Sequence, residues 1–403
     1  MRDIIFVSLE NWDEVWRRNQ FLCAALARRY PGMKILFAGL AFNVSRHLLR
    51  GSLRQLRGPI TWQVPAFPNI TVTHPLKLFP DSLSLGRKIN EWIARFQIRR
   101  LARKLGIRKP MLWVNPHSAV HMVHQMDEHC TIYDITDDWT LQPSLSSAER
   151  RIAEEQDHEL CARADLVIVC SEALLKSRRG RCSRISEIQN GVDVKHYEDV
   201  RKRPVSRSWA VPVFGYTGTL HSERTDAPLI IDLARAFPEG SVVLIGPDHW
   251  TSADRKLLAA ERNIHMPGAV PYARIPETMA QFDVCIVPHV ETVFTESLNP
   301  IKLWEYLAAG KPIVSTNIAG FRDYACFCRI ASGSKAFVAA CRAALDESDD
   351  RSSERIAEAR LHTWDARVDA VLGECAELGW ISPDWRAESN SNPSIEQIVV
   401  GNN

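Results

Sequence analysis

Short runs of apolar, often β-branched residues alternate along the chain with longer amphipathic segments. This alternation is typical of βαβ units, because parallel strands are buried on both faces while the helices between them keep one polar face. A first series of expected strands covers residues 4–8, 34–38, 111–114, 131–135 and 166–170, with an expected helix over 14–29. A second series restarts at 213–216 and continues at 242–245, 263–266, 284–287 and 312–315. The pattern predicts two doubly wound α/β domains in tandem.

A polar stretch after Asn190 and Gly191 separates the two series. An Asn-Gly pair favours a tight turn, and the following KHYEDVRKRPVSRS lacks a regular apolar pattern. A chain of 403 residues is also long for one hydrophobic core. We therefore predict a first domain over residues 1–205 and a second over 206–362. A helix over 363–380 is expected to pack back across both domains, and a polar tail follows over 381–403.

Composition narrows the class of protein. The content of 45% hydrophobic and 24% charged residues is that of a globular protein, and a net charge of +2 argues against a general nucleic-acid binder. The ten cysteines show neither paired disulfide spacing nor the CxxC pairs of a zinc site. The N-terminus lacks the pattern of a signal peptide, and no apolar run approaches the ~20 residues of a membrane span. We expect a cytoplasmic protein.

The segment TESLNPIKLWEYLAAG, residues 295–310, predicts a helix with recognisable ends. Asn299 is expected as its N-cap, Pro300 at its first position and Gly310 just beyond its last turn. The segment directly follows the apolar run FDVCIVP, so the start of the helix should lie at the carboxyl edge of a parallel sheet. α/β proteins bind ligands at this edge, and the free N–H groups of a helix N-terminus favour an anion.

Lys302 and Glu305 indicate which ligand this helix binds. Lys302 lies in the first turn, where the helix dipole disfavours a cation, and a bound diphosphate would offset that repulsion. Glu305 lies three residues later on the same face, where its carboxylate can accept hydrogen bonds from two ribose hydroxyls. The pair favours a nucleoside diphosphate. Helix physics alone leaves an alternative open, an i, i+3 ion pair on a surface helix.

The run SLNPIKLWEYLAAGKPIVST closely resembles the donor-site motif of bacterial GT-B glycosyltransferases that build exopolysaccharide and teichuronic acid chains, related to glycosyltransferase family 4. Three more segments resemble that family in order and spacing: VFGYTGTL at 213–220, NIHMPGAVPYARIPETMAQFDVCIVP at 263–288 and QNGVD at 189–193. The resemblance implies the GT-B fold, two Rossmann-like doubly wound parallel-sheet domains that face a cleft. It also implies transfer of a sugar from a nucleotide-diphosphate donor, UDP- or GDP-linked, to a lipid-linked saccharide.

The resemblance also implies donor-site residues at matching positions. These are Gly218 and Thr219 under the diphosphate, Val270 and Tyr272 near the base, Lys302 on phosphate and Glu305 on ribose, with Asn299 at the start of the helix. Arg224 follows the glycine-bearing loop and is a candidate for adding positive charge next to the leaving diphosphate. The alternative is that Arg224 is an exposed loop residue. Family 4 members often carry a second glutamate eight residues before Glu305, where this chain has Ser297, so the sugar contact departs from that pattern.

Three aspartates end the run CTIYDITDDW at the expected carboxyl edge of the first sheet. Repulsion between like charges raises a carboxylate pKa and suits it to accept a proton from a hydroxyl. In relatives of this type, including the xanthan glucuronosyltransferase, a comparable aspartate is the base, so we expect Asp137 or Asp138 to be catalytic. Two alternatives remain: Asp138 as a cap, and Asp134 held by backbone N–H groups inside the sheet edge.

Three further residues are candidates for the acceptor side of the cleft. Ser8 and Trp12 lie at the first strand-helix junction, and His117 follows the strand MLWVNP. Packing of a tryptophan into the core is the alternative for Trp12. The histidines at 117, 121 and 124 have helical spacing but lack an acidic partner, so we expect neither a metal nor a cofactor.

The stretch 86–109 carries nine Lys or Arg residues and a single acid, interleaved with apolar residues. Basic amphipathic helices of this kind lie on anionic lipid, and we predict peripheral binding to the inner face of the cell membrane. A solvated helix face or contact with RNA is the alternative. Two other functions also stay open, a nucleotide-sugar 2-epimerase of GT-B architecture and a catalytically silent module that binds a nucleotide sugar or a partner enzyme.

Overall fold

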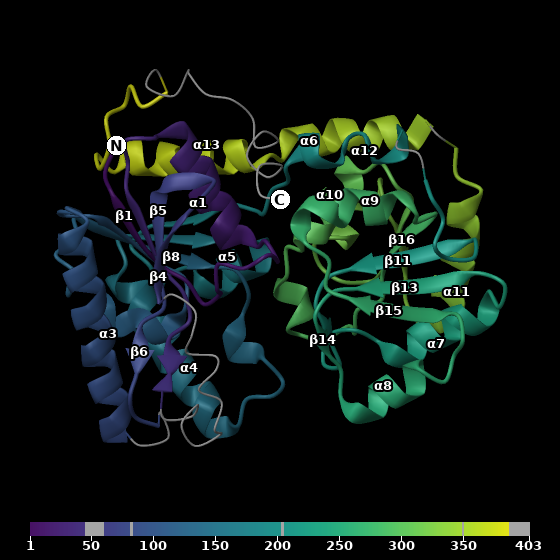
Figure 1. Cartoon of the computed structure of the whole chain (residues 1–403), viewed down its shortest axis with the longest axis horizontal. Helices are drawn as coiled ribbons and strands as arrows, with labels where there is room; N and C mark the ends of the chain where they lie inside the picture. The colour runs from purple at the N-terminus through teal and green to yellow at the C-terminus, as the bar shows by residue number, and fades with distance from the viewer. Residues whose placement is uncertain (45–59, 81–83, 203–204, 349, 387–403) are drawn as a thin grey trace.

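Two β-sheets organise the chain, one in each half of the sequence (Figure 1). The computed structural model describes residues 1–44, 60–80, 84–202, 205–348 and 350–386. The eight-stranded sheet has the order β10-β9-β8-β7-β1-β2-β5-β4, and the six-stranded sheet has the order β15-β13-β11-β16-β17-β18. All neighbours are parallel except β4 and β5.

The first sheet is built from short apolar strands. Its strands are β1 (Ile4–Val7), β2 (Ile35–Ala38), β4 (Thr61–Val64), β5 (Phe67–Thr73), β7 (Met111–Val114), β8 (Cys130–Ile135), β9 (Leu166–Val169) and β10 (Ile185–Glu187). Its helices are α1 (Arg18–Arg29), α3 (Ser84–Lys104), α4 (Ser147–Arg163) and α5 (Glu172–Arg178). The short helix α6 (Val194–Tyr197) follows β10 and already packs against the second half of the molecule (Figure 1). β3 (Phe42–Asn43) and β6 (Leu76–Lys77) form a separate two-stranded ladder. β1, β2, β7 and β9 are buried at every position, as the apolar runs require.

The second sheet repeats this plan. Its strands are β11 (Val213–Thr217), β13 (Ser241–Ile245), β15 (Ile264–Gly268), β16 (Val284–Val287), β17 (Ile313–Thr316) and β18 (Arg329–Ala331). Its helices are α7 (Ala227–Ala236), α8 (Ser252–Leu258), α9 (Ile275–Ala280), α10 (Ile301–Ala308) and α11 (Ser334–Leu345). β12 (Leu220–His221) and β14 (Asp248–His249) form a second small ladder. The predicted boundary near residue 205 falls in the connection between β10 and β11.

The last two helices connect the two halves of the molecule. α12 (Asp350–Leu361) packs on α10 of the second lobe, and α13 (Trp364–Glu377) packs on α1 of the first (Figure 1). The rings of Trp364 and Phe21 stack with their centroids 4.8 Å apart. The expected helix over 363–380 is therefore present and returns to the first lobe. The predicted polar tail lies outside the described residues from 387 onward.

The structure corrects two details of the predicted elements. α1 begins at Arg18 and not at residue 14, because the backbone of Arg17 is extended (φ −134°, ψ 173°). The Arg17 N–H donates a hydrogen bond to Gln20 Oε1. The histidine segment forms a 3₁₀ helix, His117–Met122, so helical i, i+4 spacing does not apply there. Among the described residues, no helix is long and apolar enough to cross a membrane.

Candidate active site

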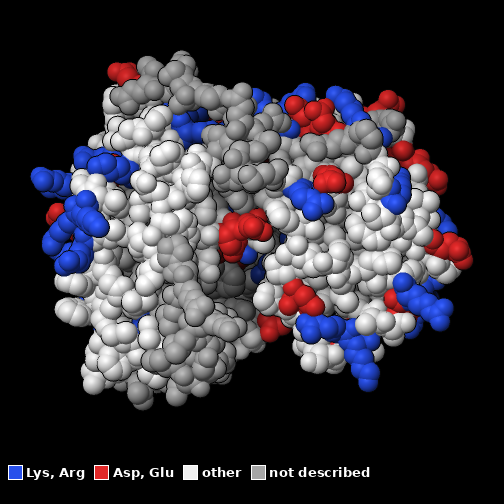
Figure 2. Space-filling model, in the orientation of Figure 1, with Lys and Arg blue, Asp and Glu red and all other residues white. Residues whose placement is uncertain are grey.

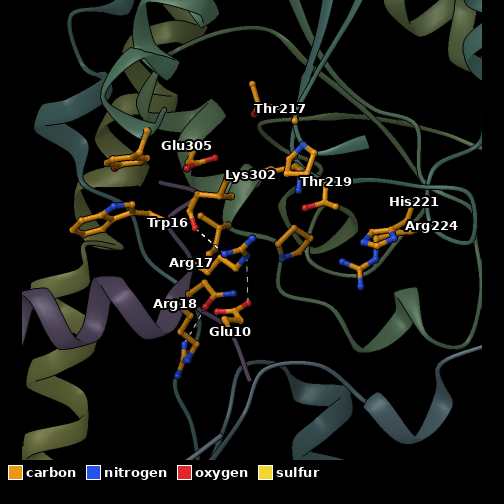
Figure 3. A pocket seen from close by; sticks show the side chains of 18 of the residues that line it. Glu10, Trp16, Arg17, Arg18, Thr217, Thr219, His221, Arg224, Lys302 and Glu305 are labelled. Atoms are coloured by element: carbon orange, nitrogen blue, oxygen red, sulfur yellow. Dashed lines mark hydrogen bonds and ion pairs between the residues drawn. The ribbon is translucent and has the colours of Figure 1, made fainter. Parts of the chain in front are cut away.

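A cavity of about 320 Å³ lies between the two lobes (Figure 3). It is lined from the first lobe by the segments that follow β1 and β8, and from the second by the segments that follow β11, β13, β15 and β16 and by the start of α10. Each of these segments leaves the carboxyl end of a parallel strand, where α/β proteins bind ligands. Figure 2 shows that acidic side chains gather where the lobes meet.

Most of the predicted donor residues line this cavity. They are Gly218, Thr219, Arg224, Val270, Tyr272, Asn299, Lys302 and Glu305. Asp137 lines it from the opposite lobe. Ser8, Trp12, His117, Asp138 and Ser297 do not belong to its lining.

Lys302 crosses directly over Gly218. A Cβ on that glycine would lie 2.1 Å from Lys302 Cε, and the backbone there has φ +146°, which a side chain rarely tolerates. The ammonium nitrogen lies 5.2 Å from the centre of the Tyr216 ring. The missing side chain at Gly218 thus makes room for the lysine, while the Gly218 N–H donates to Ile245 O at 2.7 Å.

Asn299 has a different role from the predicted N-cap. Pro300 occupies the cap position of α10 and provides no side-chain cap. Asn299 Oδ1 instead accepts hydrogen bonds from Asn190 N at 2.9 Å and from Trp304 Nε1 at 3.4 Å, and Asn190 Nδ2 donates to Asn299 O. The side chain therefore connects the two lobes and leaves the first N–H groups of α10 for a ligand.

Glu305 lines the cavity and is hydrogen-bonded to Tyr197 of α6, which lies behind it. The Tyr197 hydroxyl donates to Glu305 Oε1 at 2.9 Å, so one carboxylate oxygen is held by the protein and the other remains for a ligand. Burial raises the pKa of Glu305, against the opposing effects of Tyr197 and Lys302. Tyr272 stacks between Trp16 and His196, with ring centroids at 5.7 and 4.2 Å, so neither face is open to a base.

The two candidate base residues occupy different environments. The Asp138 carboxylate is held by both terminal nitrogens of Arg178 and by Thr140 Oγ1, and it is buried away from the cavity. Although burial raises its pKa, the hydrogen bonds and charge of Arg178 hold the pKa of Asp138 below its usual range. Asp138 is therefore a structural residue, and its prediction as a base is corrected.

Asp137 has the properties that Asp138 lacks. It lines the cavity opposite Lys302 and Arg224, and no hydrogen bond to its carboxylate is found among the described residues. Burial raises the pKa of Asp137 to about 6, against the opposing charges of Arg224 and Lys302. A carboxylate with a pKa near neutral is well matched to accept a proton from a hydroxyl.

Sequence patterns did not identify several cavity residues of the first lobe. Glu10 and Arg17 lie in the segment between β1 and α1, with Glu10 Oε1 3.6 Å from Arg17 Nε (Figure 3). Burial raises the pKa of Glu10 to about 7, against the opposing charge of Arg17. The same edge-of-sheet rule that located Asp137 would have located Glu10, which lies between the two predicted residues Ser8 and Trp12.

The predicted acceptor-side residues do not line the central cavity. Ser8 is buried and accepts a hydrogen bond from Asn19 Nδ2 at 2.9 Å, and Trp12 packs edge-on against Phe37, so both support the core. His117 lines a separate cavity of about 380 Å³. Trp139 lines both cavities, so the two lie on either side of its indole.

The sugar-contact position also differs from the expectation. Ser297 Oγ donates to Phe294 O at 2.8 Å and is 3.4 Å from Asp138 N, so it joins the lobes and does not face the cavity. The neighbouring Glu296 is held by both terminal nitrogens of Arg322. Neither residue replaces the missing glutamate. Within the part of the chain that the structure describes, no group of three or more His, Cys, Asp or Glu residues could hold a metal ion.

Comparisons with known proteins agree with this architecture. Sucrose-phosphate synthase from Thermosynechococcus elongatus superposes with a TM-score of 0.71 at 16% identity, over 94% of this chain and 99% of that one. HepE of Anabaena, solved with UDP-glucose, superposes with a TM-score of 0.65 at 15% identity, over 93% and 100%. The chain has the GT-B fold.

Sequence comparisons bear on the second lobe in particular. Residues 211–347 match the family model of glycosyl transferases group 1. A Bacillus subtilis (strain 168) protein named as a teichuronic acid biosynthesis glycosyltransferase, TuaH, is 25% identical over 262 residues, which cover 60% of this chain and 65% of that protein. The alignment thus spans slightly less than two thirds of that relative.

The environments of the two aspartates predict opposite effects on stability. Asp138→Ala leaves Arg178 buried with one acidic partner, Asp157, and should lower the free energy of unfolding by about 3 kcal/mol. Asp137→Asn removes a desolvated carboxylate and should leave the unfolding temperature unchanged or slightly higher. Thermal denaturation of both variants checks the assignment, and equal destabilisation would contradict it.

Proposed function

We propose that the protein is a glycosyltransferase that moves a sugar from a nucleoside-diphosphate donor to a hydroxyl of a saccharide acceptor. The observation that carries the proposal is the arrangement of Lys302 and the N-terminus of α10 on one side of a cavity and Asp137 on the other. One side suits a departing diphosphate, and the other suits a hydroxyl that loses its proton.

The donor half of the site matches each part of a nucleoside diphosphate. Lys302, Arg224 and the backbone N–H of Thr219 supply positive charge for the phosphates. Glu305 accepts from ribose hydroxyls, and the base lies against Val270. Anabaena HepE, which shares the fold, was solved with UDP and with UDP-glucose, which supports a UDP-linked donor.

The reaction follows from these positions. Asp137 takes the proton of the acceptor hydroxyl as the oxygen forms its bond to the sugar C1. The bond from C1 to the diphosphate oxygen breaks, and the electron pair leaves with the diphosphate. Lys302 and Arg224 stabilise this developing charge inside a partly enclosed cavity, where electrostatic interactions are stronger than in water.

Lys302→Ala should weaken nucleoside-diphosphate binding at least tenfold, because a charge-assisted contact contributes roughly 1.5–3 kcal/mol. Isothermal titration with UDP, and with GDP and ADP to identify the base, measures this change. Lys256→Ala, an exposed lysine on α8, is the matched control and should bind like the wild type. Unchanged affinity in Lys302→Ala would reject the proposed donor site.

Asp137→Asn should retain donor affinity and lose transfer by at least about a hundredfold, since general-base catalysis contributes roughly 10²–10⁴. In the wild type, kcat/KM should rise with pH through about 6 and level off above it, because the base must be deprotonated.

Incubating the donor with the protein, without an acceptor, distinguishes a transferase from the two alternative functions. A 2-epimerase converts the donor without an acceptor, and a silent module binds it without turnover.

The acceptor half of the site extends beyond the central cavity. The second cavity, with Leu9, His117, Ile152 and Trp139 in its lining, shares Trp139 with the first cavity and is largely apolar. Aromatic faces such as that of Trp139 pack well against sugar rings. The acceptor is then a saccharide whose reactive hydroxyl reaches Asp137 and whose remainder follows this cavity.

The helix α3 supports an acceptor that is anchored in a membrane. Ala94 and Ile98 are buried, whereas Trp92 and Phe96 are 59% and 53% exposed and stack on each other at 5.8 Å. Arg95, Arg99, Arg100 and Arg103 border the same surface. Figure 2 shows Lys and Arg side chains at the outer edge of the first lobe, where Figure 1 places α3. Exposed aromatic rings among arginines suit the interface of an anionic bilayer.

Reversing three charges on α3, with Arg99, Arg100 and Arg103 changed to Glu, should reduce binding to vesicles of phosphatidylglycerol and phosphatidylcholine at least tenfold. Each basic residue near an anionic surface contributes about 1 kcal/mol. Vesicle co-sedimentation measures binding. The matched control reverses Arg151, Lys176 and Lys202, which are exposed on other elements. Equal binding by both variants would contradict a role for α3.

A further inference from the structure

We propose that His289 is a neutral hydrogen-bond donor to the β-phosphate of the bound nucleoside diphosphate, with its proton fixed on Nδ1 by Tyr216. This inference builds on the proposed function and assigns a residue that the sequence motifs did not identify. His289 directly follows β16, at the edge of the sheet that carries the donor site, and lines the central cavity.

The imidazole of His289 is buried, and its two nitrogens have different surroundings. The residue is 2% exposed, and its Nε2 lies 3.1 Å from the hydroxyl of Tyr216. Among the described residues, Nδ1 has no hydrogen-bond partner. A buried polar atom without a partner costs free energy, and in a ligand cavity the ligand commonly provides the missing partner.

The contacts of Tyr216 decide which nitrogen carries the proton. The tyrosine hydroxyl has one proton to donate, and its two neighbours are His289 Nε2 at 3.1 Å and Thr219 O at 3.5 Å. The second distance is at the limit for a hydrogen bond, so the hydroxyl donates to Nε2. In a neutral imidazole the other nitrogen then bears the hydrogen, which makes Nδ1 a donor.

The surrounding charges keep the imidazole neutral and indicate its ligand. Burial lowers the pKa of His289 well below its usual value, and the nearby charges of Lys302 and Arg224 lower it further. Lys302 Nζ lies over the ring of the same Tyr216, so lysine and histidine flank one tyrosine. An acceptor oxygen that fits between an ammonium and a neutral N–H is a phosphate oxygen. The histidine thus adds a contact without adding charge.

Two substitutions separate binding to the ligand from binding to Tyr216. The side-chain nitrogen of Asn occupies the position of Nδ1, whereas that of Gln occupies the position of Nε2. His289→Gln keeps a partner for Tyr216 and removes the donor to the ligand. His289→Asn keeps the donor and removes the partner. A purely structural histidine would tolerate Gln better than Asn, and a ligand-binding histidine shows the opposite order.

Isothermal titration with UDP and with UMP measures the effect. We expect UDP to bind His289→Gln about tenfold more weakly than the wild type and His289→Asn within about threefold, while UMP affinity changes less than twofold in both. Equal UDP affinity of wild type and His289→Gln, or an equal loss in both variants, would overturn the inference. If the wild type binds none of UDP, GDP and ADP, the proposed function fails first and the role of His289 with it.

A measurement on the wild-type protein covers the case in which a variant does not fold. Selective ¹⁵N labelling of histidine distinguishes the two neutral tautomers. The His289 signals are those missing from His289→Gln or, if that variant does not fold, those that shift in Tyr216→Phe. We expect the Nδ1–H tautomer in the free protein and a shift of its resonance on adding UDP but not UMP. The Nε2–H tautomer, or no change with UDP, would reject the proposal.

Discussion

The site depends on a buried polar connection between the two sheets. Asn190, after the last strand of the first sheet, donates to Asn299, which precedes α10 of the second, and Arg18 Nη1 donates to Asn190 Oδ1 at 3.1 Å. Arg18 in turn pairs with Asp134 at 3.1 Å, with both residues almost fully buried. Removing one member would leave the others without partners in a low-dielectric environment, so the chain specifies all of them together. The connection fixes the start of α10 against the first lobe.

This connection determines how charge is distributed across the cavity. The second lobe brings Lys302 and Arg224 toward the centre, and the first brings Glu10 and Asp137. Burial raises the pKa of both carboxyl groups, while Asp138, one residue from Asp137, keeps a lowered pKa beside Arg178. The pKa values of two neighbouring acids are thus shifted in opposite directions, which suits the two residues to different roles. The difference arises because Arg178 reaches Asp138 and not Asp137.

Much of the fold followed from local patterns. The apolar runs placed ten strands within one or two residues of their positions, because strands buried on both faces leave a strong signal in the sequence. β4, β5, β10 and β18 were not predicted, and they lie toward the edges of their sheets, where burial is weaker. The segment around Lys302 and Glu305 was also recognisable, since a cation in the first turn of a helix is unusual without a ligand.

The sequence by itself determined two sheets, their carboxyl edges and the candidate donor helix, because these depend on residues that are neighbours along the chain. Only the tertiary structure separated the environments of Asp137 and Asp138, placed Asn299 and Ser297 in contacts between the lobes, and brought Glu10 and His289 to the cavity. These outcomes depend on partners more than 35 residues away in sequence, such as Arg178 for Asp138 and Tyr216 for His289. Contacts of that range arise from packing, and no local pattern of residues records them.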